Sequence, residues 1–394
     1  YDVDYISDSF IKSTSCQDGM LKTSGGACYK ALIVPAVKLV PVSTLKKLVA
    51  LVRQGATVVF VEHYPEDVPG YASLEQNRKQ LFALLEQLPG EKSFQGTQAF
   101  NFGKGRIIVG SDYHETLERT GVPAEELKTR WGVQFIRRTH TEGHHYFISD
   151  LQANDVEGWV TLNVPEKHIM CFDPMTGKRG IAKTREVEGK TQVYMQLKSG
   201  ESIILQTFTR SLQGEPEWKY RKEMDYSLSL DHGWKLRFVE SYPAIEGEFK
   251  IDTPSSWTEI AHPAAKINRG TALYSLELDL PELSADDWVL DLGDVRESAR
   301  VRINGQEAGI AWAAPFRLSI GQLLKSGKNL IEVEVTNLPA NSIAEMDRQG
   351  KQWRIFEDIN MAKLNYEKGT YGHWETLPSG LNGIVRLIPV KYLF

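Results

Sequence analysis

Residues 289–320 read VLDLGDVRESARVRINGQEAGIAWAAPFRLSI, and this stretch decides the fold of the last part of the chain. Apolar residues alternate with arginines from Ala299 to Ile303, and a period of two is typical of a half-buried strand. Asn304 and Gly305 follow at once. They are the strongest short hairpin signal, because both central positions of such a turn need positive φ. The stretch therefore predicts a β-hairpin within a β-rich domain.

The composition is that of a globular protein with more than one domain. The chain has 394 residues, of which 41% are hydrophobic and 25% charged, and this length predicts two or three domains. Its net charge of −5 is spread without long runs, which argues against a nucleic-acid partner. No apolar run approaches the ~18 residues of a membrane helix, so no membrane partner is expected. The chain begins at Tyr1 without a signal-peptide pattern, which we interpret as a processed terminus or a fragment boundary.

Residues 1–128 alternate between predicted strands and helices. A short apolar run at 30–34 and a strand at 57–61 flank a helix that is expected to begin near Ser43 and to end at Gly55. Alternation of this kind predicts a parallel sheet covered by helices, here a flavodoxin- or amidotransferase-like α/β domain.

From residue 129 onward the pattern changes to strands and turns with almost no helix. Short strands separated by turn signals predict a β-sandwich over 129–222. The polar segment 213–227 is interpreted as a linker, and 223–394 as a second all-β domain, a jelly roll. Within it, a long polar loop is expected after residue 338, before a closing strand at 383–390.

Three motifs of the stretch 289–320, LDLG, V-x-I-N-G and G-x-x-W-x-x-P-F, resemble the galactose-binding-like, sugar-binding jelly roll of family 2 glycoside hydrolases. The order of an α/β domain, a sandwich and a jelly roll is similar to the part of α-L-rhamnosidase-type (family 106-like) glycoside hydrolases that follows the catalytic barrel. YDVDYISDSFI, FIRRTHTEGHHYFISD and LPSGLNGIVRL carry this second resemblance. Leu338 and Pro339 depart from the family pattern, in which Trp often follows the motif VTN.

The resemblance implies a non-catalytic region of a bacterial periplasmic or extracellular enzyme that acts on plant-type or other complex glycans, such as rhamnosides. Glycoside hydrolysis needs two carboxyl groups ~5 to ~10 Å apart, which this family carries on the strands of a barrel. The resemblance therefore implies two partners, carbohydrate and a missing N-terminal catalytic barrel. Two alternatives stay open: a self-standing carbohydrate-binding or adhesion module, and an independent hydrolase that uses the α/β domain.

The polar segment after Val335 holds the residue types that carbohydrate sites combine, aromatic platforms with Asp, Asn and Arg. A connection of this length is usually functional or disordered. We predict carbohydrate contacts from eight of its side chains: Asn341, Asp347, Arg348, Trp353, Asp358, Tyr371, His373 and Trp374. Two alternatives are a loop whose polar groups satisfy its own backbone and a surface that docks on the barrel.

Other candidates have simpler interpretations. Trp312 and Phe316 can stack on a sugar, but we favour burial of both in the jelly-roll core. The cluster of His140, His144 and His145 with Glu142 suits zinc or nickel. We favour a polar hairpin tip there, because structural metal sites usually need a second, distant pair of ligands. The resemblance implies a structural Ca²⁺ near an edge of the jelly roll. No EF-hand spacing is present, so no metal ligand is assigned.

No catalytic residue is assigned either. The segments 62–64 and 112–114 follow predicted strands of the α/β domain, where doubly wound sheets bind ligands. Nothing in them resembles a nucleophile elbow or a phosphate loop, so we favour a structural role for this domain.

Overall fold

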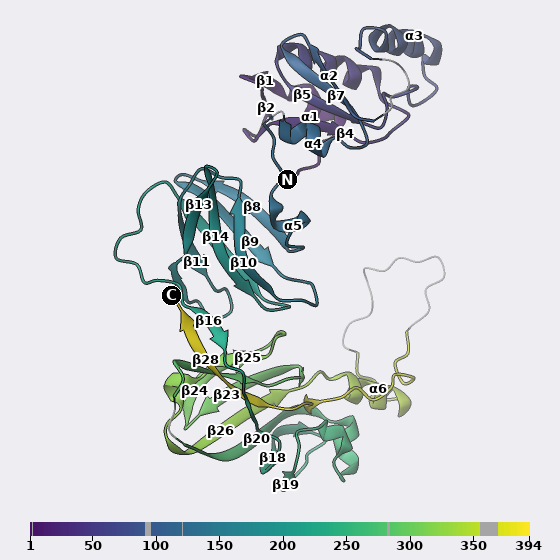
Figure 1. Cartoon of the computed structure of the whole chain (residues 1–394). Coiled ribbons are helices and arrows are strands. Elements are labelled where there is room, and N and C mark those ends of the chain that lie inside the picture. The colour runs from purple at the N-terminus through teal and green to yellow at the C-terminus, as the bar shows by residue number, and fades with distance from the viewer. Residues whose placement is uncertain (2, 91–95, 120, 282–283, 355–368) are drawn as a thin grey trace. The chain divides into compact units, whose positions relative to one another are not determined.

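The computed structural model describes every residue except 2, 91–95, 120, 282–283 and 355–368. The chain divides into two compact units, residues 1–129 with 161–164, and residues 130–160 with 165–394 (Figure 1). An α/β sheet comes first and β-rich sheets follow, so the predicted fold class is confirmed. The division into three domains at 128 and 222 stays a prediction.

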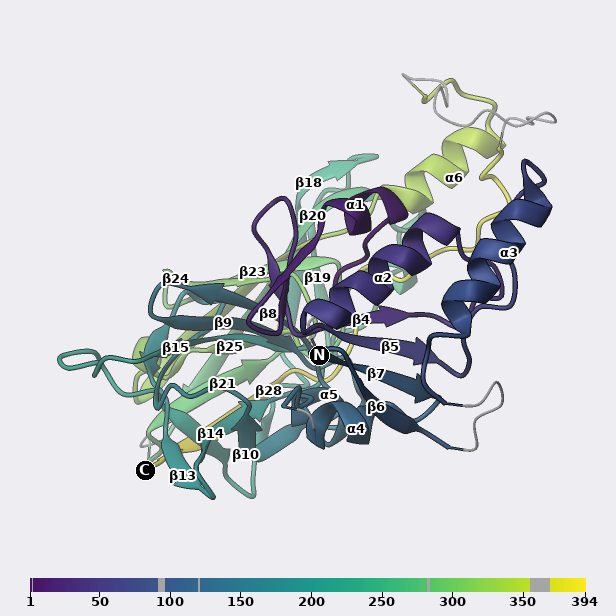
Figure 2. The same cartoon turned by 90° about the horizontal axis from the view of Figure 1, so that it is seen from above.

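A four-stranded sheet with a parallel centre forms the heart of the first unit. β4 (Ala31–Val34), β5 (Thr57–Val61) and β7 (Gly105–Gly110) run parallel, and β6 (Gln98–Phe102) pairs antiparallel with β7 at the edge. α2 (Val42–Gln54) lies alongside this sheet (Figure 2). The unit is completed by α1 (Asp8–Ser13), β1 (Ser15–Gln17), β2 (Met20–Lys22), β3 (Cys28–Tyr29), α3 (Leu74–Leu85), α4 (His114–Arg119) and α5 (Glu126–Thr129).

α2 shows which local signals hold. Its leucines at 45, 48 and 51 are buried at helical spacing, and Gly55 ends the helix with a φ of +128°, as predicted. The predicted N-cap at Ser43 is wrong. Val42 already lies in the helix, and Pro41 is the N-cap with no side-chain hydrogen bond. Proline fits this helix start because its missing N–H costs nothing in the first turn.

The sandwich at the start of the second unit has two antiparallel sheets with strand orders β12-β11-β15-β9-β8 and β10-β14-β13. Inward apolar residues such as Tyr146, Ile203 and Val193 alternate with outward, more exposed ones, which is why the strands pair in this register. The strands are β8 (Gln134–His140), β9 (Gly143–Ser149), β10 (Val156–Leu162), β11 (His168–Phe172), β12 (Arg179–Ile181), β13 (Thr184–Val187), β14 (Lys190–Leu197) and β15 (Ser202–Phe208).

The jelly roll packs two main sheets with strand orders β19-β18-β20-β26-β23-β24 and β16-β28-β21-β25. Trp234, Trp257 and Tyr274 are fully buried in its core. Its strands are β16 (Tyr220–Glu223), β17 (Leu228–Ser229), β18 (Trp234–Tyr242), β19 (Glu248–Ile251), β20 (Arg269–Leu280), β21 (Asp287–Asp291), β22 (Val295–Arg296), β23 (Ser298–Ile303), β24 (Gln306–Ala311), β25 (Arg317–Ser319), β26 (Gly327–Thr336), β27 (Gly380–Leu381) and β28 (Arg386–Leu393).

The hairpin predicted at Asn304 and Gly305 is present between β23 and β24. Ala299, Val301 and Ile303 are fully buried, and Asn304 and Gly305 have φ values of +52° and +78°. Two expectations nearby are wrong. The supposed linker 213–227 carries β16, which pairs with β28. The supposed loop after residue 338 opens with a helix, α6 (Ala340–Arg348).

Candidate functional site

The predicted carbohydrate site is built on α6 and on residues 371–377, which return from the other end of the loop. Asn341 exchanges two hydrogen bonds with the backbone of Leu377, both of 2.8 Å. At the far end of the helix, Asp347 accepts hydrogen bonds from the N–H groups of Tyr371 and Gly372 and, at 3.1 Å, from the Trp353 indole. The helix therefore serves as the anchor for both arms of the loop.

Asp347 is held in its charged form. The Tyr371 N–H and then the Trp353 indole lower the pKa of this carboxyl group from its usual value, because both donate to the carboxylate. Arg348 next to it donates to the carbonyl oxygens of Gly372 and Trp374 and pairs with Glu345 at 2.6 Å. In this structure the polar side chains of Asp347 and Arg348 thus shape the loop.

The aromatic residues of the loop form one cluster, which we call the aromatic triad: Trp353, Tyr371 and Trp374. Ring centroids are 5.7 Å apart between the first two and 4.5 Å apart between the last two. The guanidinium of Arg354 lies 5.1 Å from the ring centroids of both Trp353 and Tyr371. Trp374 is 39% exposed. The triad therefore combines one exposed indole, that of Trp374, with a cation beside its other two rings.

The structure brings together five of the eight predicted residues: Asp347, Arg348, Trp353, Tyr371 and Trp374. Asn341 is buried at the start of α6, and His373 is exposed beside the triad. Asp358 lies outside the described residues. Sequence reasoning missed Arg354. The signal was its place directly after Trp353, since arginine commonly covers an aromatic face. That these residues bind carbohydrate stays a prediction.

Trp312 is not in the core, and the prediction that placed it there is wrong. It follows the last residue of β24 and is 62% exposed, whereas Phe316 packs against the jelly-roll core. The alternation that buries Ala311 ends there, so the indole projects from the segment between β24 and β25.

The exposure of Trp312 leads to a stability prediction. Trp312→Ala should lower the free energy of unfolding by less than about 1 kcal/mol, because surface substitutions away from special features have small effects. Trp234→Ala is the matched control: its indole is 1% exposed, and its loss should cost about 3–5 kcal/mol. Urea denaturation of both variants checks this, and similar losses would contradict the exposed position of Trp312.

The histidine cluster lies at the β8–β9 hairpin. The ring of His140 lies 4.5 Å from that of His145, with its Nε2 3.1 Å from the carbonyl oxygen of Thr207. His144 instead faces the buried carboxylate of Glu166 at 3.3 Å. Among the residues that the structure describes, no group of three or more His, Cys, Asp or Glu side chains is arranged to hold a metal ion. A structural Ca²⁺ in the jelly roll stays a prediction.

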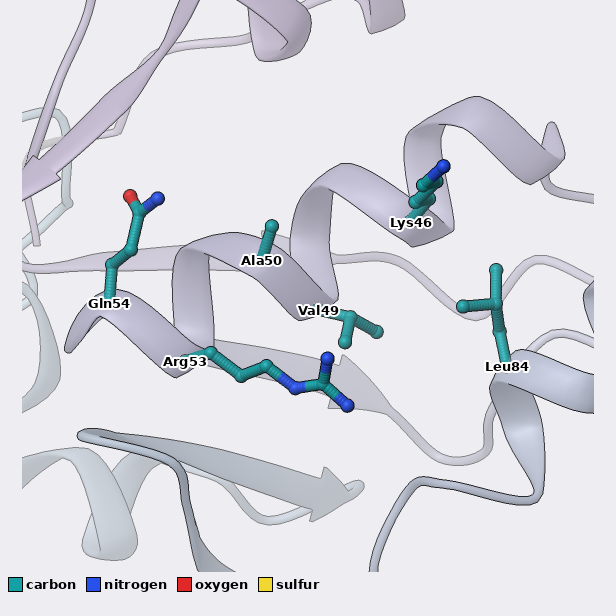
Figure 3. Close-up of a pocket in the computed structure, with 6 residues that line it drawn as sticks. All are labelled: Lys46, Val49, Ala50, Arg53, Gln54 and Leu84. Carbon is teal, nitrogen blue, oxygen red and sulfur yellow. The ribbon is translucent and has the colours of Figure 1, made fainter.

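Two features of the α/β unit are of chemical interest. Glu62, directly after β5, is exposed with a φ of +66°, a strained backbone conformation for a residue with a side chain. Separately, a shallow surface hollow of about 390 Å³ lies between α2 and α3 (Figure 3). It is lined by Lys46, Val49, Ala50, Arg53, Gln54 and Leu84. Neither feature gathers a nucleophile and a base.

In the described parts of the chain, no helix is long and apolar enough to cross a membrane.

Known proteins resemble this chain in sequence and in fold. Residues 1–184 match the family model described as alpha-L-rhamnosidase, glycoside hydrolase family 106. A curated protein of Formosa agariphila with the name "Putative beta-glucuronidase" is 29% identical over 197 residues, which cover 45% of this chain and 17% of that protein.

A solved structure of a rhamnosidase from Novosphingobium sp. PP1Y has a TM-score of 0.73 and 24% identity to this chain. The match covers 98% of this chain and 36% of the rhamnosidase, so the chain spans about a third of that protein. At this identity the likeness shows a shared fold. Together with the family match over residues 1–184, it confirms the resemblance to α-L-rhamnosidase-type glycoside hydrolases that the sequence predicted.

Proposed function

We propose that this chain is a non-catalytic region of a glycoside hydrolase that acts on plant-type or other complex glycans, rhamnosides among them. In this proposal it supports a catalytic domain of the same protein and contacts glycan through the aromatic triad. The parent enzyme works in the bacterial periplasm or outside the cell. The shared fold with a rhamnosidase of which this chain covers 36% supports the assignment to an accessory region.

The aromatic triad is the observation that supports the proposed contact with glycan. Sugar rings present apolar C–H faces and hydroxyls, so a site for them combines an accessible aromatic face with fixed polar groups. Arg354 already lies near the rings of Trp353 and Tyr371, so Trp374 is the ring left to receive a sugar. Its position is fixed from behind by Tyr371 and through its carbonyl oxygen by Arg348.

Trp374→Ala should weaken binding of an oligosaccharide substrate of the parent enzyme by about tenfold or more, since loss of one stacking platform removes about 1.4 kcal/mol or more. Trp312→Ala is the matched control, because it removes another exposed indole, 62% exposed against 39% for Trp374, elsewhere in the same unit. Isothermal titration with rhamnose-containing oligosaccharides measures both. Equal affinities for the two variants would rule out the triad as the site.

Hydrolysis tests the accessory role. We expect this chain alone to release no chromophore from a panel of aryl glycosides that includes an α-L-rhamnoside. A longer form of the protein that includes a catalytic domain should do so. Turnover by the chain alone would disprove the non-catalytic assignment and direct attention to the α/β unit around Glu62.

A further inference from the structure

The sandwich carries an exposed face that the triad does not explain. On the outer side of β8 and β9, register pairs place Ile136 beside Phe147, and Arg138 beside His145. These four residues form what we call the outer patch. Ile136 and Phe147 are 64% and 43% exposed, and Arg138 and His145 are exposed as well. An apolar row and a basic row thus lie next to each other on one face.

The apolar row continues across the sheet. Phe147 pairs with Ile204 of β15, and Ile204 pairs with Phe172 of β11. Ile204 and Phe172 are both half-buried. The exposure of the apolar row therefore increases from these strands toward β8, the edge strand of the sheet. Exposed apolar side chains gathered on one face mark interaction sites more often than scattered ones do.

In the basic row, Arg138 forms no ion pair with any residue that the structure describes. The nearest carboxylate in the sequence, that of Glu142, is paired with Arg210 at 2.9 Å. Partial desolvation and then the neighbouring His140 lower the pKa of His145. At neutral pH the positive charge of the outer patch therefore rests on the guanidinium of Arg138.

His140 adds no charge partner to this patch. Its Nδ1 accepts the N–H of Glu142, so its Nε2 carries the proton and donates to the carbonyl oxygen of Thr207 at 3.1 Å. Both ring nitrogens are occupied by backbone groups, and the ring packs edge-on against Phe208. The imidazole of His140 lies against the ring of His145, which pairs with Arg138 across the two strands.

We infer that the outer patch binds an acidic oligosaccharide, with a uronate carboxylate on the Arg138 guanidinium and a sugar ring on Phe147. Arg138 on β8 and Phe147 on β9 are diagonal neighbours in this register, about 7–8 Å apart, which places the charged and the apolar contact within reach of one or two sugar units. A guanidinium matches a carboxylate in geometry as well as in charge. A nucleic acid fits less well, because its phosphates call for an extended basic surface.

This site is separate from the aromatic triad, so each can fail without the other. The probe is the tetramer of galacturonic acid, titrated calorimetrically into the whole chain at low salt, with a neutral galactose tetramer as the comparison. We expect binding of the acidic tetramer alone, with weakening as salt is added, since exposed charges are screened. Trp374→Ala should leave this binding unchanged.

Arg138→Ala and Phe147→Ala should each weaken binding of the acidic tetramer about tenfold, and Arg138→Lys should weaken it less. Arg300→Ala is the matched control, an exposed arginine on β23 of the jelly roll. Circular dichroism confirms that the variants stay folded. The inference is overturned by any of four results: no binding, equal binding of the neutral tetramer, full binding by Arg138→Ala, or equal binding of single-stranded DNA.

Discussion

Replacing Gly380 with alanine is expected to destabilise the second unit by about 2–5 kcal/mol. The φ of Gly380 is +94°, which costs ~1–2 kcal/mol for a residue with a side chain. An added Cβ would also lie 2.1 Å from the Tyr274 hydroxyl and 2.8 Å from the Trp257 ring. Both rings are fully buried and cannot move aside, so overpacking adds ~1–3 kcal/mol.

Gly350→Ala separates the two causes. Gly350 also has a positive φ, +64°, but nothing lies within 4 Å of an added Cβ there. It should lose only the ~1–2 kcal/mol of backbone strain. Urea denaturation followed by tryptophan fluorescence measures both variants. If Gly380→Ala does not fold, adding Tyr274→Phe removes the clashing oxygen and should restore folding in part. Equal losses at the two glycines would contradict the close approach.

The effect matters for function because Gly380 is where the candidate site rejoins the jelly-roll core. The preceding residue, Ser379, accepts the N–H of Trp257 at 2.9 Å and donates its own N–H to Ser256 at 2.9 Å. The Tyr274 hydroxyl accepts the N–H of Leu381 at 3.2 Å. The base of the triad loop is thus hydrogen-bonded to buried aromatic residues. A displacement of Gly380 should therefore also displace the residues of the aromatic triad.

The strands of the jelly roll could be predicted because a single local rule decides each of them. Alternation along β23 fixes which face is buried, and Asn304 with Gly305 supplies the positive φ that the hairpin needs. α2 follows from helical spacing of leucines and from Gly55 as its end. In these elements local preference and tertiary packing agree.

α6 could not be predicted by the same rules. Its sequence, ANSIAEMDR, is mostly polar, its N-cap Pro339 makes no side-chain hydrogen bond, and it buries Asn341 and Ser342 along with Ala344. The helix depends on tertiary partners, such as the two hydrogen bonds between Asn341 and Leu377. Partners this far apart along the chain leave no periodic signal.

The candidate site could likewise be predicted only in part. Its residue types were apparent from composition, but their tasks were not. Asp347 is predicted to contact carbohydrate, which stays a prediction, and in the structure its carboxylate accepts backbone N–H groups, as one of the alternatives describes. The exposure of Trp312 was missed because a large aromatic residue beside a strand is more often buried than not.

Asp347→Ala should weaken glycan binding at the aromatic triad by at least the factor of about ten that is expected for Trp374→Ala. The carboxylate is the acceptor that holds the indole of Trp353 and the N–H groups of Tyr371 and Gly372 in one place. Without this carboxylate the three rings are no longer held in one arrangement. Binding must then also order them, and this entropic cost lowers the affinity.

Limited trypsin digestion offers an independent measure. Cleavage after Lys351 and Arg354 should be faster in Asp347→Ala than in the unaltered chain, while the melting temperature of the second unit changes little. Asp279→Ala, which removes an exposed carboxylate on β20, is the matched control and should alter neither binding nor cleavage. Unchanged cleavage in Asp347→Ala would contradict the anchoring role.

The same anchor predicts the pH dependence of binding. The folded pKa of Asp347 lies below its unfolded value of 3.8, so its contribution is fully present above that value and is lost as the pH falls through the folded pKa. Binding at the triad should therefore stay constant from neutral pH to about 4.5 and decline only in stronger acid. In Asp347→Asn, which cannot ionise, the remaining binding should lack this decline, and a decline that persists there would assign it to another group.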